Sequence, residues 1–186
     1  MKAILSLLTA ASLGMGVAHA QQKLIPAQSE ILFVAKQMGV PVEGRFKKFD
    51  AQVVFDPLKP ETSKIAFTVD IASATMGAPE TDSELPKATW FDTARFPQAT
   101  FQSSSVKSLE RGKFEVVGKL TIKGNTQDAL VPVTLTQSGA NTTASGVLPI
   151  KRLAFKIGEN EWADTSLVAN DVQVKFKLLL SGVGKF

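Results

Sequence analysis

The sequence contains no cysteine and no tyrosine, and its single histidine, His19, lies near the N-terminus. Without cysteine the chain cannot form a disulfide, so its stability in an oxidising compartment must come from the packing of its core. Without histidine or cysteine after residue 20, the rest of the chain cannot build a Ser-His or Cys-His nucleophilic pair or a His-ligated metal site. These absences leave only carboxylate, lysine or hard-metal chemistry for catalysis.

Residues 1–20 have the three parts of a secretory signal peptide. A lysine at position 2 is followed by an apolar run over about 3–17, and the run ends in Ala-His-Ala directly before Gln21. The run is too short and too rich in small residues for a comfortable membrane span. We therefore expect cleavage before Gln21 and a secreted single domain over residues 21–186.

The charge balance argues against nucleic-acid binding. The chain has 21 basic and 17 acidic residues, a formal net charge of +4, and the basic residues are scattered without forming a stripe. The densest acidic group is Glu80, Asp82 and Glu84, with Asp92 just beyond. These carboxylates could act as acid and base or hold calcium, but no glycine-containing loop of EF-hand spacing accompanies them. Acids in the first turn of a short helix are the simpler interpretation, and we assign no catalytic residue, metal or cofactor.

Alternating apolar residues indicate β-strands along most of the chain. Ile65, Phe67, Val69 and Ile71, for example, would all point to one face of a strand. Segments with strand character, separated by glycine, proline and asparagine turns, are 29–36, 42–56, 65–72, 98–106, 114–122, 131–135, 141–150 and 172–180. Within 42–56, Gly44 and the Lys47-Lys48 pair suggest a bend or bulge.

Helical character is confined to residues 79–91, where Pro86 limits any helix to short pieces. Short strands without intervening helices predict an all-β fold, with an antiparallel sheet that closes into a barrel or folds into a sandwich.

Four segments carry a family resemblance: VEGRFKKFDAQVVFDP at 42–57, WFDTARFPQATFQS at 90–103, GKLTIKG at 118–124 and IKRLAFKIG at 150–158. In this order and spacing the chain resembles the YceI-like family of secreted bacterial proteins. The resemblance implies a single eight-stranded lipocalin-like barrel, a periplasmic location, and binding of polyisoprenoid or similar amphiphilic lipids without catalysis. Many members have a histidine early in the first hairpin, where this chain reads AKQMGV with Met38.

The predicted interior mixes large and small residues. Phe33, Phe67, Phe101 and Phe176 point inward together with small residues, which could leave gaps for a ligand: Gly44, Ala99, Ser103, Gly118 and Gly146. An eight-stranded barrel can hold one slender ligand or be filled by its own side chains, and alternation alone does not distinguish the two.

If the barrel is hollow, we expect ligand contacts from Phe33, Met38, Phe46, Phe67, Ile71, Phe101, Leu120, Arg152 and Phe176. Arg152, with Lys151, is the expected partner of a phosphate head, since the family usually has an arginine here and a guanidinium can donate two bonds to phosphate. Trp90 and Trp162 either cap the core or close the mouth. A partner-binding module, a homodimer and a carboxylate enzyme remain alternatives.

Overall fold

The computed structural model describes residues 22–186, so the expected signal peptide at 1–20 lies outside the described residues. The strands are β1 (Lys23–Leu24), β2 (Glu30–Gln37), β3 (Val40–Phe46), β4 (Phe49–Val54), β5 (Lys64–Asp70), β6 (Ala74–Thr75), β7 (Gln98–Glu110), β8 (Lys113–Ile122), β9 (Asn125–Ser138), β10 (Asn141–Lys151) and β11 (Asp171–Ser181). The helix α1 spans Pro79–Glu84, and short 3-10 turns span Pro26–Gln28, Pro60–Thr62, Ile71–Ser73, Arg152–Phe155 and Asn160–Ala163. Within this part of the chain, no helix is long and apolar enough to cross a membrane.

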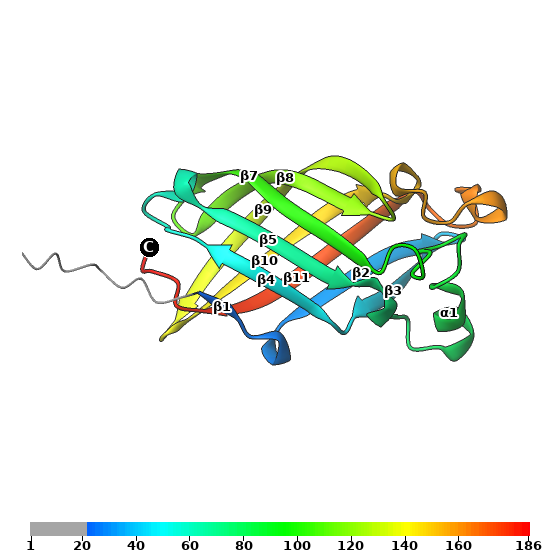
Figure 1. The fold of residues 1–186 in the computed structure, drawn as a ribbon, viewed down its shortest axis with the longest axis horizontal. Coiled ribbons are helices and arrows are strands. Elements are labelled where there is room, and N and C mark those ends of the chain that lie inside the picture. Colours follow the sequence, from blue (N-terminus) through cyan, green and yellow to red (C-terminus); the bar gives the residue numbers. More distant parts are fainter. Residues whose placement is uncertain (1–21) are drawn as a thin grey trace, which may run out of the picture.

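All strands belong to one antiparallel sheet that curls around an apolar interior (Figure 1). Its order is β4-β5-β7-β8-β9-β10-β11-β2-β3-β6, and β1 pairs with β11. The predicted all-β antiparallel barrel with one short helix is therefore confirmed. Figure 1 shows α1 and the segment after β10 at one end of the barrel, and the end of β4 at the other.

The strand count differs from eight partly because the predicted strand 42–56 is divided in two. β3 pairs with β2, whereas β4 pairs with β5 on its other side. The change of partner occurs at Lys47 and Lys48, whose backbone N–H groups donate to the Ser73 hydroxyl at 3.1 and 3.0 Å. The lysine pair thus marks the bend, and the exchange of neighbours lets one stretch of chain curve around the barrel. The two-residue strands β1 and β6 account for the remaining difference.

The first described residues connect β11 to the end of β4. Lys23 and Leu24 pair with Ser181 and Leu180 of β11. The Gln22 side chain exchanges two hydrogen bonds with the backbone of Phe55, at 2.5 and 2.7 Å. This contact brings together two strands that share no ladder and helps close the barrel at the end opposite α1.

Two apolar clusters lie inside the barrel, one toward each end. One contains Phe55, Val106 and Phe114 near the end of β4. The other contains Ile71, Leu85 and Phe91 below α1. The ladder between β9 and β10 extends no further than the pair Thr134 and Ser145. Pro132, two residues before Thr134 in β9, has no N–H group with which to continue it.

Candidate functional site

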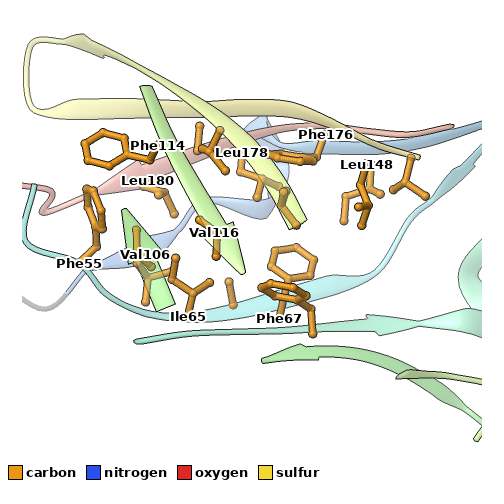
Figure 2. Close-up of a pocket in the computed structure, with 18 of the residues that line it drawn as sticks. Phe55, Ile65, Phe67, Val106, Phe114, Val116, Leu148, Phe176, Leu178 and Leu180 are labelled. Atoms are coloured by element: carbon orange, nitrogen blue, oxygen red, sulfur yellow. The ribbon is translucent and has the colours of Figure 1, made fainter. Parts of the chain in front are cut away.

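The barrel interior holds two chambers. The inner chamber has a volume of about 200 Å³ and exposes no polar surface. Figure 2 shows its walls, with Phe67, Phe114 and Phe176 pointing inward from different strands and Phe55 from the residue after β4. An interior of this kind can accept hydrocarbon but offers no hydrogen bond to a polar ligand.

The outer chamber lies below α1 and has a volume of about 470 Å³. Most of its lining is apolar, and its polar side chains include Gln37, Glu80, Thr81 and Glu84. A volume of this size is within the range of small-molecule sites, about 300–1,000 Å³. A ligand in this chamber could therefore keep a polar end near α1 and an apolar body below it.

The two chambers adjoin in the middle of the barrel. The residues that line both are Ile31, Val69, Ala99, Leu120, Leu148 and Val174. Ala99 contributes only a methyl group at this junction, and the other five shared residues are larger and apolar. Together the two chambers form one elongated interior, called the tunnel below, with its polar end near α1.

The structure places eight of the nine predicted contact residues in the tunnel wall. Phe67, Phe101 and Phe176 line the inner chamber, and Leu120 lines both chambers. The outer chamber also includes Phe33, Phe46, Ile71 and Arg152. Their role in ligand binding remains a prediction.

The expectation for Met38 needs correction. Met38 is in the turn between β2 and β3 and is 70% exposed. It lines neither chamber, whereas the preceding residue, Gln37, lines the outer one. Met38 is one of the two residues of the turn, so its side chain lies at the tip of the hairpin and does not point into the barrel.

The expectation that Arg152 binds a phosphate head does not fit the geometry. Its side chain is 1% exposed, and its five N–H groups donate to five backbone carbonyls at 2.6–3.0 Å. The acceptors are Ile157, Gly158, Trp162, Val168 and Ala169. Every donor is used, so Arg152 organises the segment after β10 and has none left for a ligand. Lys151 is exposed and pairs with Asp171 at 2.5 Å.

Lys123 holds the same segment from the other side, a role that sequence reasoning missed. Its ammonium, on a side chain only 5% exposed, donates to the carbonyls of Ala88 and Lys156 at 2.6 and 2.7 Å and to Glu159 Oε2 at 2.8 Å. The hydrogen bond from Lys123 holds the pKa of Glu159 below its ordinary value. Lys123 thus joins the loop before β7 to the segment after β10, and both contribute to the outer chamber.

The acidic residues near α1 mostly have structural partners. Asp82 accepts hydrogen bonds from the Thr75 hydroxyl and the Met76 N–H, which lower the pKa of Asp82 and attach α1 to β6. Glu84 pairs with Lys87 at 2.5 Å. Among residues 22–186, no group of three or more His, Cys, Asp or Glu side chains could hold a metal ion.

Trp90 and Trp162 both line the outer chamber, and their ring centroids are 5.5 Å apart. The indole nitrogen of Trp90 is buried and has no hydrogen-bond partner within the described part of the chain. A buried N–H without an acceptor is costly, and it marks a place where a ligand oxygen would be stabilised.

Gly44, Gly118, Gly146 and Ser103 do not leave the gaps that the sequence suggested. A Cβ built on Gly118 would lie 2.6 Å from Cζ of Phe101, and one built on Gly146 would lie 2.5 Å from Cζ of Phe176. The Ser103 hydroxyl accepts a hydrogen bond from Ile65 N at 2.9 Å. Each glycine is thus covered by a phenylalanine of a neighbouring strand, and the open space lies between the strands' inner faces.

Comparison with known proteins agrees with this architecture. The YceI-like domain family matches residues 23–180. The chain belongs to the YceI-like family. Among solved structures, BcnA of Burkholderia cenocepacia is 48% identical, with 84% of this chain and 98% of that chain covered and a TM-score of 0.82.

Two further proteins are similar to this chain at lower identity. A UPF0312 protein of Azotobacter vinelandii is 32% identical over 128 residues, which are 67% of each chain. A structure described as a polyisoprenoid binding domain from Saccharophagus degradans has a TM-score of 0.70 at 15% identity and covers 88% of this chain and 99% of that one. At 15% identity, the similarity to the Saccharophagus degradans domain concerns the fold alone.

Proposed function

We propose that this YceI-like protein is a non-enzymatic binding or carrier protein for a polyisoprenoid or similar long-chain amphiphile, and that it acts in the periplasm. The observation that carries the proposal is the tunnel, whose inner chamber exposes no polar surface and whose outer chamber has polar groups at one end. Apolar burial at about 0.8 kcal/mol per CH₂ would supply the affinity. The name of the Saccharophagus degradans domain, a polyisoprenoid binding domain of the same fold, supports the choice of ligand class.

The polar end of the ligand would lie in the outer chamber near α1. Trp90 Nε1 is a buried donor without a partner among the described residues, and Gln37, Glu80 and Thr81 lie in the same chamber. The Arg152 guanidinium, bound to carbonyls, is no longer a candidate for a phosphate. Carboxylates in the wall would repel an anionic head, so an uncharged head with an acceptor oxygen, such as an alcohol or carbonyl, fits this chamber better.

Two measurements test the proposal. Mass spectrometry of an organic extract of the protein, purified from the periplasm of its own host, should find a long-chain amphiphile in near-stoichiometric amount. Titration of lipid-free protein with geranylgeraniol, followed by Trp90 and Trp162 fluorescence, should show saturable binding. A protein that extracts free of lipid and leaves geranylgeraniol unbound would contradict the carrier role.

A further inference from the structure

Three apolar side chains stand exposed beside the outer chamber. Met38 and Val40 are 70% and 63% exposed, and Leu167 is 41% exposed. Met38 N donates to the carbonyl of Leu167 at 2.8 Å, so the β2–β3 turn and the segment before β11 are joined at this point. We call Met38, Val40 and Leu167 the apolar tip.

The apolar tip borders the tunnel directly. Gln37 forms a bridge with Val168, and both residues line the outer chamber. The β2–β3 turn lies at the same end of the barrel as α1 (Figure 1). A surface that receives the tip would therefore lie beside the outer chamber.

The backbone at Met38 indicates that packing and turn geometry do not explain this side chain. Met38 has φ of 48° and Gly39 has φ of 80°, the left-handed pair of a two-residue hairpin turn. Asparagine or glycine suits the first position, whereas methionine is disfavoured there. A mostly exposed methionine at a strained position stabilises the isolated protein little, and such sites are often functional.

We propose that the apolar tip inserts into the surface of a lipid bilayer, and that the tunnel opens to the bilayer at the outer chamber, which we call its mouth. Three side chains on two adjoining loops cannot bury the roughly 800 Å² per partner of a stable protein interface. A bilayer needs no such area, because a few apolar side chains can enter the boundary between head groups and acyl chains. Residues 37–42 carry no charge that would oppose insertion. This inference rests on the proposed function, since docking at the mouth serves the uptake or delivery of a lipid.

The test compares the wild type with Met38→Asn/Val40→Thr in flotation with vesicles of phosphatidylethanolamine and phosphatidylglycerol. Asparagine suits the turn and threonine retains the β-branch, so the double variant should unfold at the same urea concentration as the wild type or higher. Its vesicle partition coefficient should be lower by roughly tenfold, because less apolar surface enters the lipid. Leu167→Asn, which leaves the turn intact, should lower it in the same direction. Leu58→Asn is the matched control, because Leu58 is 79% exposed and follows β4 at the opposite end of the barrel.

The inference is overturned if the wild type partitions no better than the double variant, or if Leu58→Asn lowers partition equally. It is also overturned if sedimentation velocity shows a wild-type dimer that the double variant loses while vesicle binding is unchanged, since the tip would then bind a second copy. Geranylgeraniol titration of the same proteins separates the two proposals. If the variants bind geranylgeraniol as tightly as the wild type but partition less onto vesicles, the docking proposal is supported. If no protein, including the wild type, binds geranylgeraniol, the carrier function is contradicted, and the vesicle comparison alone decides the role of the tip.

Discussion

The ring of Phe33 on β2 lies directly over Gly44 on β3, its partner in the sheet. A Cβ built on Gly44 would be 2.1 Å from Cζ of that ring, so no side chain fits while the ring stays in place. The same arrangement holds for Phe176 over Gly146. Glycine here lets the ring lie flat against the backbone, which keeps the aromatic group in the wall and leaves the tunnel open.

Gly44→Ala should therefore lower the free energy of unfolding by about 1–3 kcal/mol, the usual cost of overpacking a core. Urea denaturation measures the change. Gly184→Ala is the control, because a Cβ there would meet Pro57 at 3.6 Å, an ordinary contact, and its effect should be within about 0.5 kcal/mol. Equal effects of the two substitutions would show that the ring moves aside without cost.

Ala99→Leu should obstruct the junction between the two chambers. The leucine side chain would occupy space that the proposal gives to ligand, so geranylgeraniol affinity should fall at least roughly tenfold with little change in the stability of the lipid-free protein. Gln102→Leu, on the exposed side of β7, is the control and should leave affinity unchanged. A packed interior would respond in the opposite way, with a loss of about 1–3 kcal/mol in stability.

Trp90→Phe tests the unpaired indole nitrogen. Phenylalanine retains an aromatic ring in the outer chamber but removes the donor, so affinity for geranylgeraniol should fall by a factor of about 3–10, the value of one hydrogen bond. Affinity for squalene, which has no oxygen, should change much less; the fluorescence of Trp162 reports both titrations. Equal losses for alcohol and hydrocarbon would mean that Trp90 acts through its shape.

Arg152→Lys should destabilise the protein strongly although the charge is retained. An ammonium has three donors and cannot reproduce five bonds in the plane of a guanidinium. We expect a loss of about 3 kcal/mol or more in the free energy of unfolding, as for a buried charge with broken contacts. Lys151→Arg, at the exposed neighbour, should have almost no effect. If Arg152→Lys instead retained stability and lost ligand binding, the guanidinium would have to be assigned to the ligand.

Glu159→Gln should change how stability depends on pH. The folded pKa of Glu159 lies below its ordinary value of 4.5, so the carboxylate stabilises the fold above that pH and this contribution is lost as the pH falls through the lower, folded pKa. The variant should be less stable than the wild type at pH 7, and the difference should disappear in acid. Urea denaturation across this range checks the sign, with Glu161→Gln as the control. A difference that grows in acid would contradict the assigned role of the Lys123 bond.

Much of the fold follows from the sequence alone. Period-two alternation located β5, β8 and β11 closely, because a strand with one buried face must alternate. The weaker alternation at 98–106 found the start of β7, and the small-residue segment 141–150 matches β10. The four family segments identified the barrel, and eight of the nine predicted residues line the tunnel. Alternation and short motifs depend only on residues that are close together in the sequence, so they can be recognised without knowing which strands pair.

What the tertiary structure decided is which neighbour each residue meets. The bend at Lys47 was visible in the sequence, but the exchange of partner from β2 to β5 was not. Glycines read as gaps are covered by rings from adjacent strands. Arg152 and Lys123, cations that suggest a phosphate or a surface, instead hold backbone carbonyls of segments far apart in the chain. A sequence records how many donors a side chain has, whereas only the folded backbone brings acceptors around it, and this determines whether a charge is available to a ligand or used within the protein.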